Sequence, residues 1–329
     1  MLSGFLRRNV NLGRGETGNS NPAGPRAPTL VRSNSEETLI DGDNSELVSL
    51  FTTNSEETLG VANIKIFGKP LSSYNQVKEF PIITGFLLQG TSIFESAESF
   101  KQHVIDPVKV NPFLHISPTW GSIFKKNAPY ITIYTFEPQK TIFCQVYFKV
   151  ISNWISYYRL SFTAEGIDDV ILLNNNSYDP TVDFEYNGTK FRITGITGTT
   201  STFGGNGLIK IFVMYPTSEL LSNDMTMDES AKPQLKSKLS LLIEKRDRQS
   251  IHKLIEHDKP AVALPIATFI DVGSEKVLAK YVKSGVVKMF TNNDHTFETI
   301  MSSILLVLRE QESRKFRGNN KPSYVQNSG

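Results

Sequence analysis

The stretch TIFCQVYFKV, at residues 141–150, decides the fold class of this chain. Ile142, Cys144, Val146, Phe148 and Val150 fall on one face, and Phe143, Gln145, Tyr147 and Lys149 fall on the other. Successive side chains of a strand point to opposite faces of a sheet, so this period of two predicts a β-strand with one face toward a core. The segment therefore indicates a β-rich domain around it.

The same pattern recurs on both sides of this strand. Further strands are predicted at residues 130–136, 157–163, 170–173, 182–186, 190–196 and 208–215. Short turn sequences separate them, and the Gly-rich residues 195–207 are interpreted as a long hairpin loop. Six or seven strands joined by short turns favour an antiparallel β-sandwich or jelly roll. One helix is predicted before them, at residues 92–105.

Composition divides the 329 residues into four parts. Residues 1–60 are rich in Gly, Asn, Ser and Pro, which predicts a disordered segment that is basic first and acidic later. Residues 61–216 are the predicted β-rich core, residues 217–312 a mostly helical region, and residues 313–329 a disordered basic tail. The expected fold class is mainly β, with a sandwich or jelly-roll-like core, a helical C-terminal region and disordered termini.

Apolar residues at helical spacing predict three helices in the third part. The first covers residues 224–257, the second runs from Ser274 to just before Gly285, and the third covers residues 295–312. The apolar stripe of the first consists of Leu235, Leu239, Leu242, Ile243, Ile251, Leu254 and Ile255, and that of the third of Phe297, Ile300, Ile304 and Leu308.

Several kinds of chemistry find no support in the sequence. Cys144 is the only cysteine, which excludes a disulfide within the chain and a cysteine-based zinc site. No phosphate loop or G-x-S-x-G motif occurs, and the five histidines do not cluster. Cys144 is expected to be buried and inert, His115 to be a hydrogen-bonded structural residue, and Asp168-Asp169 to lie in a solvated turn. We predict a non-enzymatic protein without catalytic residues, metal or cofactor; an enzyme with scattered residues is the least favoured alternative.

The start of the chain, MLSGFLRRNVNLGRG, has no long apolar run, so no signal peptide is expected. Its basic character leaves a mitochondrial presequence open. No run of eighteen apolar residues occurs, so no membrane-spanning helix is expected. These observations predict an intracellular protein.

A group of basic residues in the third part suggests a binding surface. Residues 232–259 hold eight Lys and Arg against four acids, and the candidate residues are Lys236, Lys238, Lys245, Arg246, Arg248 and Lys253. Two interpretations stay open: a solvated outer helix face, or a surface for nucleic-acid phosphates or an anionic membrane. We expect sequence-independent binding to single-stranded nucleic acid, with peripheral membrane association as the alternative.

The N-terminal part repeats the sequence NSEETL at residues 34–39 and 54–59. Ser33, Ser35 and Ser55 are candidate phosphorylation sites, because they lie beside charged residues in a segment expected to be mobile. Two short nascent helices with capping-box spacing are the alternative interpretation.

One constellation resembles a known family. The sequence ISPTWGS at residues 116–122 precedes an alternating strand, Pro138 and the strand at residues 141–150, and a later Gly-led strand ends in Tyr215. This order resembles the thirty-kilodalton superfamily of plant-virus movement proteins, most closely those of negative-strand plant viruses. The family-like residues are Pro118, Thr119, Trp120 and Tyr215. One departure is that Asn153 follows the apolar strand, where the family has a characteristic Asp.

The resemblance implies a jelly-roll-like core and a non-enzymatic movement protein. Such a protein binds nucleic acid or nucleocapsid and supports cell-to-cell transport through plasmodesmata. The resemblance also implies self-association, contact with host membranes and host proteins, and a location at the host cell periphery; without it, a cytoplasmic location is expected. The alternatives are a viral capsid- or matrix-type structural protein, and a cellular β-rich adaptor with a phosphorylated N-terminal segment.

Overall fold

The computed structural model describes residues 64–84, 90–119, 128–136, 139–196, 207–221, 236–277 and 280–319, and it describes no side chains at residues 273–284 and 314–319. Trp120, the predicted disordered segment 1–60 and the candidate phosphorylation sites Ser33, Ser35 and Ser55 lie outside the described residues.

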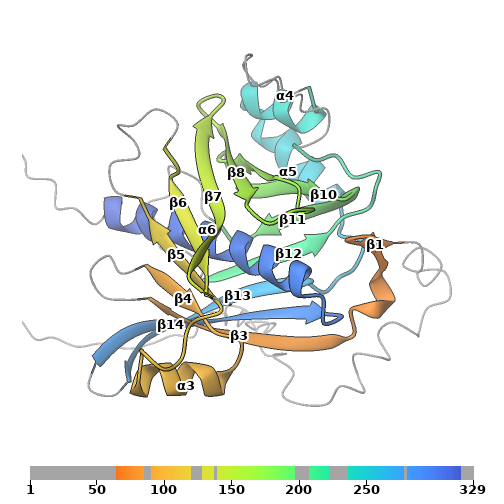
Figure 1. Ribbon diagram of the computed structural model, residues 1–329. Helices are drawn as coiled ribbons and strands as arrows, with labels where there is room; N and C mark the ends of the chain where they lie inside the picture. The colour runs from red at the N-terminus through yellow and green to blue at the C-terminus, as the bar shows by residue number, and fades with distance from the viewer. Residues whose placement is uncertain are drawn as a thin grey trace, which may run out of the picture. The chain divides into compact units, whose positions relative to one another are not determined.

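Strands outnumber helices in the described part of the chain, as predicted from the alternating sequence (Figure 1). The elements before residue 140 are β1 (Lys65–Ile66), β2 (Lys69–Pro70), the 3₁₀ turn η1 (Leu71–Ser73), β3 (Gln76–Thr84), β4 (Thr91–Ile93), α3 (Ala97–Ile105), β5 (Leu114–Pro118) and β6 (Ile131–Thr135). Those after it are β7 (Thr141–Val150), β8 (Ile155–Phe162), β9 (Val170–Asn175), β10 (Thr181–Tyr186), β11 (Thr189–Thr194), β12 (Leu208–Val213), α4 (Lys238–Glu244), α5 (Arg248–His257), β13 (Ala267–Val277), β14 (Lys280–Thr291) and α6 (His295–Asn319).

Within the described residues, twelve strands form one closed antiparallel barrel. Each strand from β3 to β14 pairs with the next one in the chain, and β14 closes the barrel on β3, from Lys283↔Thr84 to Thr291↔Gln76. The predicted sandwich or jelly roll is therefore wrong. The period-two pattern identifies strands, but it is the same in a sandwich and in a barrel, because both have one face inward. Closure depends on the pairing of two distant segments.

Part of the expected helical region belongs to the barrel. The helix predicted from Ser274 to just before Gly285 is wrong, because the backbone there continues the β13–β14 ladder through Ser274↔Lys283 and Glu275↔Val282. Lys, Glu, Ala and Leu favour helix locally, but pairing between strands overrides this weak preference. The predicted core boundary at residue 216 therefore falls inside the barrel. The helix predicted at residues 92–105 starts later, at Ala97, because Thr91–Ile93 pairs as β4.

Helix α6 fills the barrel. Figure 1 shows it in dark blue, crossing the interior with strands on both sides. All side chains of residues 297–312 are buried, not only the predicted stripe. The sequence IMSSILLVL at residues 300–308 is apolar on nearly every side, and a helix of that kind requires burial all round. The barrel supplies it with inward side chains such as Phe80, Ile82, Leu114, Ile133 and Val146.

Strand β7 is confirmed as a strand, but only its middle faces the core. Cys144 and Val146 are fully buried, whereas Ile142, Phe148 and Val150 are 40%, 40% and 67% exposed. Figure 1 shows the β7–β8 hairpin rising above its neighbours. The C-terminal end of β7 therefore extends beyond the filled part of the barrel.

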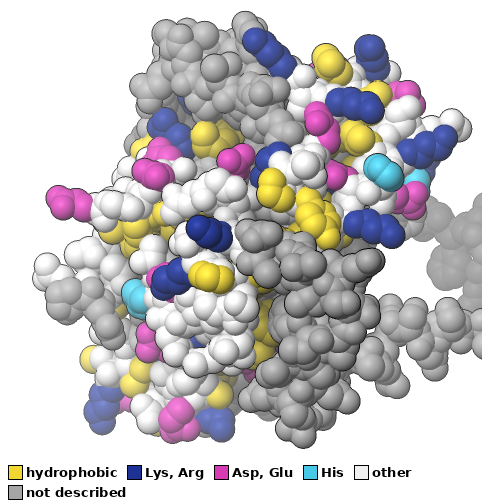
Figure 2. Space-filling view, turned by 90° about the vertical axis from the view of Figure 1, so that its right-hand side faces the viewer, with side chains coloured by type: hydrophobic (Ala, Val, Ile, Leu, Met, Phe, Trp, Pro, Cys, Tyr) yellow, Lys and Arg dark blue, Asp and Glu magenta, His cyan; other side chains and the backbone are white. Residues whose placement is uncertain are grey.

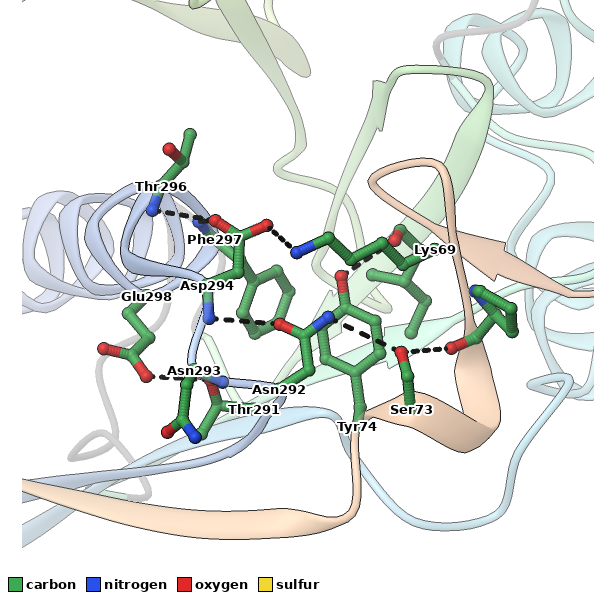
Figure 3. Close-up of polar contacts among 12 residues, drawn as sticks. Lys69, Ser73, Tyr74, Thr291, Asn292, Asn293, Asp294, Thr296, Phe297 and Glu298 are labelled. Carbon is green, nitrogen blue, oxygen red and sulfur yellow. Dashed lines mark hydrogen bonds and ion pairs between the residues drawn. The ribbon is translucent and has the colours of Figure 1, made fainter.

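A polar network fixes the start of α6 (Figure 3). Asp294 accepts hydrogen bonds from the backbone N–H of Phe297 at 3.4 Å and from Lys69 Nζ at 2.8 Å. Burial raises the pKa of the Asp294 carboxyl, but these hydrogen bonds outweigh burial and the pKa is lowered. One turn later, Glu298 forms an ion pair with Lys78 on β3 at 2.8 Å. The helix is thereby tied to the strand on which the barrel closes.

The barrel has two distinct ends. We call the end where α6 begins, near Lys78, the entry end, and the other the exit end, where Arg309 Nη1 donates to Thr91 Oγ1 at 3.0 Å. The registers place the β7–β8 turn and the β9–β10 loop at the exit end.

Helices α4 and α5 cover the outer face of β8 and β9 (Figure 1). They bury a second, smaller apolar cluster, which contains Ile155, Tyr157 and Leu173 from the strands and Leu239, Ile243 and Ile251 from the helices. The expected apolar stripe of this region thus packs against the barrel, and its other face is left to solvent.

A buried ion network fixes this pair of helices beside β10 and β11. Arg192 binds Asp183 with two hydrogen bonds, of 2.8 and 3.1 Å, and approaches Asp258 at the end of α5 at 3.4 Å. Burial lowers the pKa of Arg192, but the two carboxylates outweigh it and the pKa is raised. The Arg192 side chain is 4% exposed and that of Asp183 is fully buried, so the pair is shielded from solvent.

Candidate nucleic-acid interface

The predicted helix over residues 224–257 consists, where described, of two short helices with a sharp turn between them. Arg246 follows the last turn of α4 with φ 58°, in the left-handed region. Its N–H donates to the carbonyl of Ile243 at 3.0 Å, and that of Asp247 donates to the carbonyl of Leu242 at 3.1 Å. This is a Schellman motif, in which glycine is the usual residue at the position of Arg246. Asp247 then caps α5 by accepting from the N–H of Ser250 at 3.1 Å.

The structure places all six predicted basic residues on the solvent side of this helix pair. Lys236, Lys238, Lys245, Arg246, Arg248 and Lys253 are exposed. Among the described residues, no ion pair within 4.0 Å involves any of the six. We call these six residues the basic surface.

Three acidic residues near the basic surface, Asp258, Asp179 and Glu256, contact groups outside it. Asp258 accepts from Arg192 and from the backbone N–H of Glu219, the latter at 2.9 Å. Asp179 and Glu256 flank His252 at 3.1 and 3.0 Å. Figure 2 shows Lys and Arg side chains at the upper right of the molecule, at the height of α4 and α5 in Figure 1, with hydrophobic and acidic side chains between them. Two exposed acids, Glu244 and Asp247, lie among the six cations, and the pKa of Asp247 is lowered by hydrogen bonds from Ser250 and by the charge of Lys253. Because none of the six cations has an ion pair within 4.0 Å among the described residues, the basic surface keeps a net positive charge toward an external anion.

Two aromatic residues that the sequence analysis missed adjoin the basic surface. Trp154 lies in the β7–β8 turn and Tyr178 in the β9–β10 loop, with ring centroids 6.3 Å apart and planes inclined by 27°. The guanidinium of Arg246 lies 5.7 Å from the centroid of Trp154, and that of Arg248 lies 5.1 Å from the centroid of Tyr178. Each aromatic follows Asn or Ser in a polar turn, which was the available signal.

The residues that carry the family resemblance are not brought together. Pro118 ends β5 at the exit end, and the N–H of Thr119 donates to the carbonyl of Tyr130 at 3.1 Å. Tyr215 follows β12 at the entry end. Trp120 belongs to the undescribed residues. The jelly-roll core that the resemblance implies is absent, because the described strands form the closed barrel.

Three other residues considered in the sequence, Cys144, His115 and Asp169, have the burial or hydrogen bonds of structural residues. Cys144 is buried, and burial raises the pKa of its thiol. His115 shares a hydrogen bond with Ser92 Oγ at 3.0 Å, and its pKa is lowered to about 4 by burial and by the charge of Lys140. Asp169 accepts from Ser161 Oγ at 2.8 Å. Among the described residues, no group of three or more His, Cys, Asp and Glu could hold a metal ion.

Comparison with known proteins assigns the chain to a family. A family model described as DIA1 matches residues 75–307, more than half of the chain. The chain belongs to the DIA1 family. The DIA1 match begins just before β3 and ends within α6, so it contains every strand of the barrel, the basic surface and most of the buried part of the central helix. No curated protein and no solved structure matches the chain.

In the part of the chain that the structure describes, no helix is both long and apolar enough to cross a bilayer.

Proposed function

We propose that this protein is a non-enzymatic binding protein that holds single-stranded nucleic acid on its basic surface. The observation that carries the proposal is the set of six exposed cations on two short helices and the residues beside them, without ion-pair partners among the described residues. Cations that are already paired contribute little to binding a phosphate chain. Unpaired ones release counterions from it and so provide affinity that is independent of base sequence.

The fold supports a rigid presentation of these charges. The apolar side of α4 and α5 packs on β8 and β9, and the contact of Arg192 on β11 with Asp258 holds the end of α5 against the barrel. Because the helices are fixed, the backbone that carries the cations loses little conformational freedom when a ligand arrives, and only the side chains must be ordered.

Charge removal on and off the surface tests the proposal. One variant changes Lys245, Arg246 and Arg248 to Gln, and a matched control changes Lys65, Lys101 and Lys140, which are also exposed. Binding of a fluorescently labelled single-stranded oligonucleotide is measured by anisotropy across a salt series. Each lost phosphate contact lowers the salt slope by about 0.7, so the surface variant should lose about 2 and the control much less. Equal losses in both variants would reduce the proposal to an effect of net charge.

Anionic vesicles provide the alternative ligand, because lipid phosphates attract the same cations. We expect single-stranded RNA to compete with vesicles containing phosphatidylserine for the protein. Tight vesicle binding that RNA does not displace would favour peripheral membrane association instead.

Cell-to-cell transport through plasmodesmata, and the self-association and nucleocapsid contact that the resemblance implies, stay predictions. Nucleic-acid binding agrees with them but does not require them. A fluorescent fusion in plant epidermal cells tests transport directly: paired spots at cell walls support it, and diffuse fluorescence speaks against it.

A further inference from the structure

The residues around Trp154 and Tyr178 combine aromatic rings with positive charge. Arg246, Trp154, Tyr178 and Arg248 form a continuous series in which each aromatic ring has a guanidinium beside it and the rings stack on each other. The four residues come from three segments: the β7–β8 turn, the β9–β10 loop, and the junction of α4 and α5. The series exists only because the helix pair is folded onto the outside of the barrel.

One ring of the series is open to solvent. Tyr178 is 52% exposed, although a Tyr ring gains from burial. Trp154 is half-buried and supports Tyr178 from one side. An exposed ring held in place by a neighbouring ring and a cation is suited to stacking with a planar ligand group.

The backbone is also unusual at this point. Arg246 takes a left-handed φ of 58° at the position where a Schellman motif favours glycine. Non-glycine residues in this region are uncommon and often lie at functional sites. The left-handed turn brings the Arg246 guanidinium beside Trp154, so the strained residue and the aromatic series belong to one local structure.

Polar atoms in these two loops and at the adjoining strand ends lack hydrogen-bond partners among the described residues. Trp154 Nε1, Asn174 Oδ1, Ser177 Oγ and Thr181 Oγ1 are buried and, among the described residues, form no hydrogen bond. Buried groups of this kind are rare in folded proteins and call for an explanation at each position. Here they gather around the exit-end loops that carry the two rings.

We propose that Trp154 and Tyr178, with Arg246 and Arg248 beside them, form a stacking platform for the unpaired bases of single-stranded nucleic acid. This inference rests on the proposed function and names what the site recognises besides phosphate. Bases in a duplex are already stacked on each other, so the platform discriminates against double strands. Every base has a π face, so the preference among bases is slight.

The test compares ligands with and without bases on the full-length protein. Anisotropy is measured with a labelled single-stranded DNA, an abasic DNA of the same length, and the corresponding duplex. The wild type should bind the base-bearing strand at least fivefold more tightly than the abasic one. Tyr178→Ala should lose about five- to hundredfold in affinity for the base-bearing strand and nothing for the abasic one. Tyr178→Phe, which keeps the ring, should bind like the wild type.

Tyr134→Ala is the matched control, because Tyr134 also lies beside a cation, Lys140 at 4.6 Å, but on β6 and away from the helix pair. It should not change affinity for either strand. Circular dichroism melts confirm that each variant is folded.

The outcomes separate this inference from the proposed function. If the wild type binds base-bearing and abasic strands equally, or Tyr178→Ala weakens both to the same degree, the platform is refuted while electrostatic binding stands. If the wild type binds neither strand at low salt, both proposals are refuted.

Discussion

Arg246 allows a quantitative test of the turn between α4 and α5, because its backbone conformation favours glycine. Its φ is 58°. A side chain in the left-handed region costs about 1–2 kcal/mol, and the greater freedom of glycine in the unfolded chain opposes a change to glycine by about 0.4–1 kcal/mol. Arg246→Gly and Arg246→Ala both remove the guanidinium beside Trp154, but only the glycine variant relieves the backbone. We therefore expect Arg246→Gly to be more stable than Arg246→Ala by about 1 kcal/mol.

Urea unfolding followed by circular dichroism measures this difference, and the thermal midpoints should differ by about 2–4 °C for a domain of this size. Lys245 is the internal control, because its φ of −72° and ψ of −9° are helical. At that position glycine should be less stable than alanine, which reverses the order.

Binding adds a second readout to the same variants. Both Arg246 variants lose one cation of the basic surface and the contact with Trp154, so both should bind single-stranded nucleic acid more weakly than the wild type and to a similar degree. Alanine and glycine variants of equal stability would refute the assigned backbone conformation. An Arg246→Gly protein that binds as tightly as the wild type would remove Arg246 from the interface.

Two further predictions concern the barrel. Arg192→Ala leaves the fully buried carboxylate of Asp183 without its ion-pair partner, which should cost about 3–5 kcal/mol in urea unfolding; a loss below 1 kcal/mol would contradict the buried pair. The pKa of His115 is about 4 in the fold and about 6.5 when unfolded, so the unfolded chain binds a proton first and stability falls as pH drops from 6.5 to 4. Allowing for solvent screening of a half-buried ring, the loss is about 2 kcal/mol, and His115→Asn should abolish this part of the pH dependence. An unchanged pH profile in that variant would refute the assignment.

Local sequence determined the elements whose pattern is strong over a short range. The alternation in β7 and its successors identified strands, and apolar spacing identified the helical character of α4, α5 and α6. The same spacing predicted that the basic residues between positions 236 and 253 lie on the face opposite the apolar stripe. The structure has them on that face. These inferences succeed because side-chain periods of 2 and 3.6 follow directly from backbone geometry.

The tertiary structure decided how the elements combine. Whether strands close into a barrel depends on pairing between β3 and β14, which lie some two hundred residues apart and share no local signal. The segment at residues 274–285 has helix-forming composition, and only its ladder between β13 and β14 makes it a strand. Burial of α6 on all sides likewise required a closed sheet to receive it.

The candidate site divides in the same way. The sequence by itself determined its charge, because Lys and Arg exposed on a helix face can be read from their spacing. Its aromatic part was decided by the fold, since Trp154 and Tyr178 lie in separate turns and meet Arg246 and Arg248 only when α4 and α5 pack on β8 and β9. Contacts between segments distant in the chain depend on packing of the whole molecule, and the periodicity of a local sequence does not predict them.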